Sequence, residues 1–134
     1  MEHHAIGLVE INSIAKGFEV CDAMAKTANV TVLVAKCICP GKYIVMIGGD
    51  VAAVRQSVEA GESIAGSTLV DRFVIPNIHS SVLPAISGGN SIENVQALGV
   101  IETYSVAATI EAADAAEGGF RGSATHAPCL RDRR

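Results

Sequence analysis

The sequence predicts an α+β domain in which a four-stranded antiparallel sheet is backed by two helices. Three observations predict this fold class. Short runs rich in β-branched residues alternate with two amphipathic stretches, the elements follow the order β-α-β-β-α-β, and together they occupy about 75 residues. Hydrophobic residues make up 49% of the 134 residues and charged residues 18%, which excludes a disordered chain.

The first strand and helix are predicted from residues 5–29. The apolar run 5–10, AIGLVE, is typical of a buried strand. Ser13 is placed to cap a helix of about 14 residues, whose apolar side chains recur at helical spacing until Asn29. This spacing places Cys21 on the apolar stripe, so we expect it in the core.

A hairpin is predicted next, from strands at 30–38 and 43–47 joined by a Pro40-Gly41 turn. Gly48-Gly49 is expected to end the second strand, and Asp50 to cap the following helix. A glycine pair before a helix also suggests a phosphate loop. The spacing matches neither G-x-G-x-x-G nor the P-loop pattern, so capping is the better interpretation.

The second helix is expected over residues 51–65, followed by a strand at 69–75 that Pro76 ends. These elements define a first domain, residues 5–79. Residues 80–96 contain Pro84 and Gly88-Gly89 without clear periodicity, which indicates a linker.

The chain then repeats itself at an offset of 92 residues. Eight of the twenty-one residues from 5 to 25 are identical to their counterparts in 97–117, and most other pairs are apolar in both copies. Residues 97–117 therefore begin a second, incomplete copy, with a strand and a helix expected.

The repeat and the composition both change at residue 118. Thirteen of the 14 acidic residues precede this point, whereas residues 118–134 carry four Arg and one Asp. A truncated or frame-shifted second domain with a foreign, poorly ordered tail is one interpretation. A C-terminal extension that folds back on the first copy is the other.

Several classes of function are not expected. The net charge of −4 argues against nucleic-acid binding, which needs clustered Lys and Arg. No apolar stretch approaches the roughly 18 residues of a membrane span, and the N-terminus lacks the features of a signal peptide. We therefore expect a cytosolic chain, in which the four cysteines are thiols or metal ligands rather than disulfides.

The first copy resembles the bacterial microcompartment shell proteins throughout residues 5–79. The segments that carry this resemblance, in order, are AIGLVE, CDAMAKTANV, the turn at 40–42, GGDVAAVRQSVEAG and VIPNIH. The second start, ALGVIETYSVAATIEAADAA, is similar to the tandem-domain subclass, in which three chains make a pseudo-hexameric tile. Within that subclass KCICPGK and NIHSSVLPAISG resemble the T-type shell proteins of propanediol-utilisation microcompartments.

The resemblance implies a metal site. In the T-type proteins, one Cys from each of three chains is understood to bind a [4Fe–4S] cluster on the symmetry axis, and the ICPGK motif places that role on Cys39. Thiolates suit Fe–S clusters better than hard cations. Taken without the family, Cys39 is better explained as a plain turn residue than as a ligand. The central pore turn implied by the resemblance consists of Ile38, Pro40, Gly41 and Lys42 beside Cys39.

The other candidate ligands fit less well. Cys37 forms C-x-C with Cys39, but one such pair supplies only two of the four ligands of a closed zinc site. In the family pattern Cys37 is an extra residue, so it is the weaker candidate. No role is assigned to Cys129, and His3-His4 is expected to be a disordered terminus.

The resemblance assigns Lys26 to the contact between tile edges, with a solvated Lys at the helix end as the alternative. Family members often have Arg where this chain has Asn77, so part of that contact is altered. Catalysis is not expected, since Cys39 and His79 form the only nucleophile–base pair worth naming and no motif brings them together.

The sequence therefore predicts a structural, non-enzymatic shell tile with a central [4Fe–4S] cluster that transfers electrons or delivers a cluster across the shell. The expected partners are the chain itself, as a homotrimer or, if the second domain is lost, a homohexamer, together with other shell proteins and an enclosed redox enzyme. Neither nucleic acid nor a membrane is an expected partner. A small cytosolic ligand-binding or regulatory α+β domain is the alternative function, and an electron carrier on the same fold is a third.

Overall fold

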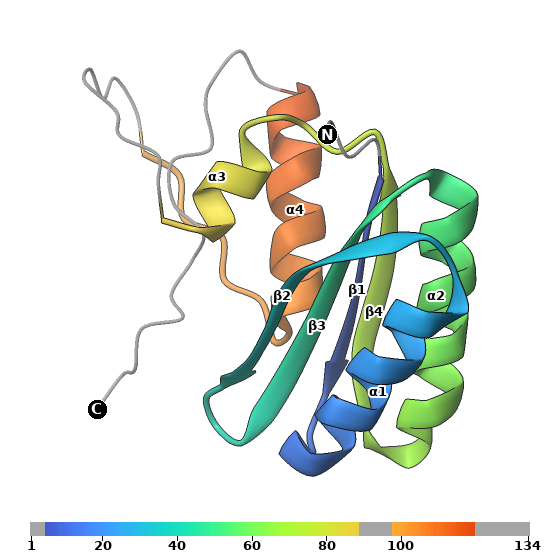
Figure 1. Cartoon of the computed structure of the whole chain (residues 1–134). Helices are drawn as coiled ribbons and strands as arrows, with labels where there is room; N and C mark the ends of the chain where they lie inside the picture. Colours follow the sequence, from blue (N-terminus) through green and yellow to red (C-terminus); the bar gives the residue numbers. More distant parts are fainter. Residues whose placement is uncertain (1–4, 89–97, 120–134) are drawn as a thin grey trace. The chain divides into compact units, whose positions relative to one another are not determined.

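Residues 5–78 fold into a sheet with helices in the order that the sequence predicts (Figure 1). The computed structural model describes residues 5–88 and 98–119, which belong to two units, residues 1–78 and 79–134. The elements of the first unit are β1 (Ala5–Ile11), α1 (Ile14–Thr27), β2 (Val30–Ile38), β3 (Lys42–Gly49), α2 (Val51–Ala65), the short 3₁₀ turn Gly66–Thr68 and β4 (Leu69–Pro76).

The four strands form one antiparallel sheet in the order β2-β3-β1-β4. The predicted fold class is thus confirmed. The sheet places β1 at the centre, where it pairs with both β3 and β4 along its length, and every residue of β1 is buried. β2 is an edge strand and has several exposed residues. An apolar sequence such as AIGLVEI suits this position, in which the strand is paired on both sides and packs against the helices of the same unit.

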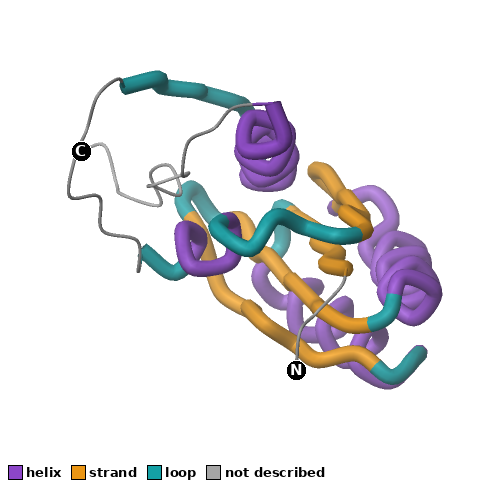
Figure 2. The backbone as a smooth tube through the Cα atoms, turned by 90° about the horizontal axis from the view of Figure 1, so that it is seen from above, coloured by secondary structure: helices purple, strands orange, loops and turns teal. Residues whose placement is uncertain are grey.

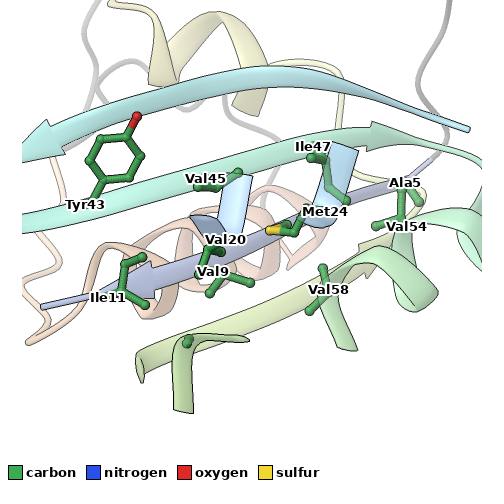
Figure 3. Packing of buried hydrophobic residues seen from close by; sticks show 11 residues of the cluster. Ala5, Val9, Ile11, Val20, Met24, Tyr43, Val45, Ile47, Val54 and Val58 are labelled. Carbon is green, nitrogen blue, oxygen red and sulfur yellow. The ribbon is translucent and has the colours of Figure 1, made fainter. Parts of the chain in front are cut away.

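The core lies between the sheet and the two long helices of this unit, which Figure 2 shows together on one side of the strands. Alternate residues of β1 and β3 point to the same side because side chains alternate across a strand. Figure 3 shows how they meet the helices. The buried cluster includes Val9 and Ile11 of β1, Tyr43, Val45 and Ile47 of β3, Val20 and Met24 of α1, and Val54 and Val58 of α2.

One strand boundary differs from the sequence expectation. Gly48 and Gly49 continue β3 instead of ending it, because they pair with Ile6 and Ala5 of β1 on one side and with β2 on the other. Strand partners on both sides outweigh the low intrinsic preference of glycine for a strand. Asp50 then caps α2 as predicted, and its carboxylate accepts a hydrogen bond from the Ala52 amide at 3.1 Å.

The second unit contains two described helices, α3 (Val82–Ile86) and α4 (Val106–Gly119). α3 lies in the segment expected to be a linker, whose residues 89–96 are outside the described part. α4 matches α1 in the first copy at the same offset of 92 residues, and Ser105 caps it through a 3.0 Å bond from the Ala108 amide.

The strand expected at the start of the second copy does not form. Residues 98–103 have no strand structure, although the corresponding residues of the first copy make up β1. A strand is held by hydrogen bonds to neighbouring strands, and among the described residues 98–103 have no such neighbour. Leu98, Val100 and Tyr104 accordingly have more than 80% of their surface exposed (81, 84 and 93%).

Candidate functional site

The predicted site is the tight turn between β2 and β3 (Figure 1). Ile38 and Lys42 form the last cross-strand pair of the hairpin, so the turn itself consists of Cys39, Pro40 and Gly41. Ile38 ends β2 where the strand predicted at 30–38 ends, and Lys42 begins β3 one residue before the predicted start at 43. Both residues, which the resemblance also assigns to the pore turn, flank the turn because their backbones pair with each other. Gly41 has a φ of 72°, a left-handed conformation that glycine adopts without a Cβ clash.

Cys39 and Cys37 are both exposed free thiols, but their settings differ. Cys37 is a residue of β2 and lies opposite Tyr43 of β3. Cys39 lies in the turn, beyond the last paired residue of the strand. A thiol at the tip of a hairpin is accessible to a group outside the chain, and this is the property that a shared metal site requires.

Cys21 is a poor candidate for a ligand. It is partly buried and packs against the core, in agreement with its predicted place on the apolar stripe of α1. Burial, and then the nearby charge of Asp22, raise the pKa of its thiol above the ordinary value of 9.0. Since thiolates are the metal-binding form, this environment disfavours binding.

Tyr43 lies in β3 close to the turn and packs against α1, the helix that carries Cys21. Burial raises the pKa of its phenol, and charge on Cys21 and Cys37 raises it further. Its ring lies against Phe18 of α1, with ring centroids 5.4 Å apart. The phenol therefore stays neutral and acts as a packing residue beside the hairpin.

A buried ion pair lies next to the turn. The Nζ of Lys42 is 2.6 Å from Oε1 of Glu10, and the side chains are 16% and 0% exposed, respectively. The register explains the contact. Glu10 lies opposite Ile44, two residues beyond Lys42 on the same face of the sheet, so the two side chains are diagonal neighbours across β1 and β3.

The ion pair was not predicted from the sequence. Glu10 is the one charged residue in the apolar run that forms β1, and a charge in a buried strand needs a partner. That signal was present in the sequence. It did not identify Lys42, which is 32 residues away along the chain.

Lys26 is exposed at the end of α1, where its Nζ lies 2.7 Å from Oδ1 of Asp22 one turn earlier. This is an ordinary i, i+4 surface pair, which contributes little stability and leaves the ammonium accessible. Its role in a contact between tile edges stays a prediction. Asn77, at the end of the first unit, has a φ of 59°.

His79 belongs to the second unit, and the structure gives it structural partners there. Its backbone amide donates to Oδ1 of Asp114 at 2.8 Å, and its Nδ1 lies 2.8 Å from Ser81 Oγ and 3.8 Å from Glu117 Oε2. Both side-chain contacts use the same ring nitrogen. A catalytic triad needs the two ring nitrogens to face different partners, so this is not one.

The described part of one chain has no metal site of its own. Within residues 5–88 and 98–119, no three His, Cys, Asp or Glu side chains are grouped so that they could hold a metal ion. Helices of that part are also too short or too polar to cross a membrane. His3, His4, Cys129 and the tail beyond residue 119 lie outside the described residues.

Comparisons with known proteins, by family model and by sequence, find the same protein family. Residues 5–78 match the model of the BMC domain. The chain is 62% identical, over 112 residues, to the bacterial microcompartment shell protein PduT of Citrobacter freundii, and the match covers 84% of this chain and 61% of that protein. It is 33% identical to the shell protein PduA of the same organism, covering 68% of this chain and 100% of PduA.

A solved structure is also similar. The crystal structure of a microcompartment protein from Desulfitobacterium hafniense DCB matches with a TM-score of 0.76 and 53% identity, and the match covers 87% of this chain and 65% of that one. The chain thus spans somewhat less than two thirds of PduT and of this structural relative.

Proposed function

Because this chain belongs to the BMC-domain family of bacterial microcompartment shell proteins, we propose that it is a structural component of a microcompartment shell and that its β2–β3 turn carries a shared metal centre. The relatives reported above are named as microcompartment or shell proteins, and none is named as an enzyme. The similarity to PduT favours a propanediol-utilisation microcompartment in the cytoplasm as the setting.

The proposed assembly is a trimeric tile. Three chains surround an axis that passes through the 39–41 turns, and the tile joins other shell proteins edge to edge, with Lys26 among the edge residues. If a second domain is not completed, six copies of the first domain are the alternative ring. Closed rings of this kind need large self-complementary surfaces, and small residues on flat elements suit them.

The observation that carries the metal proposal is the exposed thiol of Cys39 at the tip of the hairpin. Among residues 5–88 and 98–119 no three such ligands are grouped, and the proposed site at this turn draws its ligands from several chains. Three symmetry-related Cys39 thiolates supply three ligands of a [4Fe–4S] cluster, and thiolates are the ligands that such clusters take. Cys37 is the second, weaker candidate.

When bound, a cluster of this kind supplies one-electron transfer, with a potential set by the charges and hydrogen bonds around it. The chain's own part is to present the thiols, exclude competing ligands and keep the turn in place. Electron transfer to an enclosed redox enzyme, or delivery of a cluster to it, would follow from a site at the centre of a tile.

Two single substitutions test the proposal. Protein prepared anaerobically should show the broad visible absorbance of an Fe–S cluster, with four irons per three chains. Cys39→Ser should abolish both the absorbance and the bound iron, because the hydroxyl is a poor ligand for this cluster. Cys37→Ser is the matched control and should retain them.

Iron and acid-labile sulfide are measured in each sample after gel filtration. If both variants keep the cluster, or if anaerobic wild-type protein has none, the metal proposal is wrong. The proposed shell role does not depend on that result, since it is judged by assembly.

A further inference from the structure

Glu10 is a buried charge close to the proposed metal centre. Its partner, Lys42, directly follows the turn. Its carboxylate has none of its surface exposed, and Oε1 is 2.6 Å from the Nζ of Lys42. A charge pair in such a setting interacts more strongly than a surface pair, and removal of one partner leaves the other charge poorly compensated. The pair therefore restricts where the Lys42 side chain can lie.

The positions of Glu10 and Lys42 show which part of the chain is restricted. Glu10 is on β1, the central strand, which is paired with β3 and β4. Lys42 is the first residue of β3 and closes the turn by pairing with Ile38 of the edge strand β2. The ion pair thus links β1, which is paired on both sides, to the residue immediately after Gly41.

We propose that Glu10 is a positioning residue for Cys39: by holding Lys42 against the sheet, it fixes the turn from which the thiol is presented. This rests on the proposed function, because it assigns the turn as the metal centre. Glu10 lies in β1, outside the turn, and acts through Lys42. The same contact holds the Lys42 ammonium on the sheet face, next to β1.

Other charges lie on the same face. Asp71 of β4 is opposite Glu10, and Lys36 of β2 is opposite Ile44, which is itself opposite Glu10. Replacing Glu10 by Gln keeps the shape of the side chain and removes one negative charge from this row. The partly buried ammonium of Lys42 then interacts more favourably with water than with the neutral side chain at position 10. We therefore expect the turn to loosen.

The test compares Glu10→Gln with Glu62→Gln in the full chain. Glu62 forms a pair of similar length, 2.7 Å to Nε of Arg72, but both side chains are substantially exposed (36% and 47%). Hydrogen exchange is followed by mass spectrometry in the peptide that spans the turn and in peptides from α1 and α2. Bound iron per chain is measured in parallel after anaerobic preparation.

Glu10→Gln should speed exchange in the turn peptide by about fivefold or more relative to wild type, as expected for a locally opened segment, with little change in the helices. Bound iron should fall to less than about half, since misplaced ligands bind metal more weakly. Glu62→Gln should match wild type in both measurements. A general loss of stability would raise exchange in the helices as well, so the local pattern distinguishes positioning from a purely structural role.

A folded Glu10→Gln protein with wild-type exchange in the turn overturns the proposal, as does equal acceleration in all peptides. If Glu10→Gln does not fold, the double variant Glu10→Gln, Lys42→Gln removes both charges and keeps two groups that can hydrogen-bond. Its turn should also exchange faster than wild type, and a wild-type rate there contradicts the role of the charge pair.

The two proposals fail in different ways. If wild-type protein binds no iron but Glu10→Gln still loosens the turn, the metal centre is wrong and the positioning of the turn by Glu10 stands. If wild-type protein binds the cluster and Glu10→Gln changes neither measurement, the positioning role alone is wrong.

Discussion

Single glycines allow close approach between a helix and a strand, and between the two helices, in the first unit. A Cβ built on Gly17 of α1 would lie 2.5 Å from the ring of Tyr43, far inside normal contact. A Cβ on Gly61 of α2 would lie 2.7 Å from Cγ and Sδ of Met24, a flexible side chain that can move aside. The two glycines are thus both close to the opposite element but differ in how easily the neighbour can yield.

Gly17→Ala should therefore destabilise the protein more than Gly61→Ala. Overpacking against a buried ring costs about 1–3 kcal/mol, and the gain in helix propensity from Gly to Ala returns only about 1 kcal/mol. We expect a net loss for Gly17→Ala and a near-neutral result for Gly61→Ala. Urea unfolding of both variants measures the difference, and equal stabilities would contradict the rigid role of the Tyr43 ring.

Residue-level predictions from the sequence succeeded where the chemistry is local. Pro40-Gly41 indicated a turn, and the turn is there, with Gly41 in the left-handed region. The Glu10–Lys42 pair could not be assigned in the same way, because it depends on which strands are neighbours and on their register. The same limit applies to Cys39, whose position at a tip was predictable and whose ligand role stays a prediction.

At the scale of elements, helix caps decide where the two long helices of the first unit begin. Asp50 accepts from the Ala52 amide at 3.1 Å, whereas Ser13 accepts from the Lys16 amide at 3.4 Å, near the limit of a hydrogen bond. A carboxylate at a helix N-terminus also interacts favourably with the helix dipole. The cap of α2 is therefore the stronger of the two.

We expect Asp50→Ala to lower the free energy of unfolding by about 1 kcal/mol, a typical loss for an N-cap. Ser13→Ala should cost less, because its bond is longer and uncharged. Thermal or urea denaturation of both variants under the same conditions gives the comparison. A larger loss for Ser13→Ala would show that bond length in this structure does not rank the caps.

Element boundaries show which sequence signals were overridden. Gly48-Gly49 was expected to end a strand, but partners on both sides keep it in β3. The supposed linker contains the short helix α3. In both cases the prediction relied only on the intrinsic secondary-structure preferences of the residues. These preferences are weak compared with strand pairing and packing.

At the scale of the whole molecule, the shell proposal requires assembly. Native mass spectrometry or light scattering should give a mass of three or six chains, or larger multiples, and sheets or tubes at high concentration. Stable interfaces of this kind bury on the order of 1,200–2,000 Å² or more. Cys39→Ser should assemble like the wild type, because large surfaces rather than the turn hold the ring together. A clean monomer at all concentrations would contradict the shell role and favour a small ligand-binding or regulatory domain.

The internal repeat separates what the sequence alone determines from what the tertiary structure decides. The first copy forms α1 at Ile14–Thr27, and the second forms α4 at Val106–Gly119. The two helices occupy the same positions of the repeat at an offset of 92, and each has a Ser at its cap. The sequence alone determines these helices, because their hydrogen bonds close within four residues and the capping side chains are adjacent.

The matching strand segments have different outcomes. Residues 5–11 form the central strand of a sheet, whereas 98–103, with a closely similar sequence, have no strand structure. Only the tertiary structure decides this, because a strand's hydrogen bonds belong to its neighbours: β3 and β4 provide them for β1, and no described strand provides them for 98–103. The same neighbours bring Glu10 to Lys42, so the setting of the turn is a property of the folded sheet.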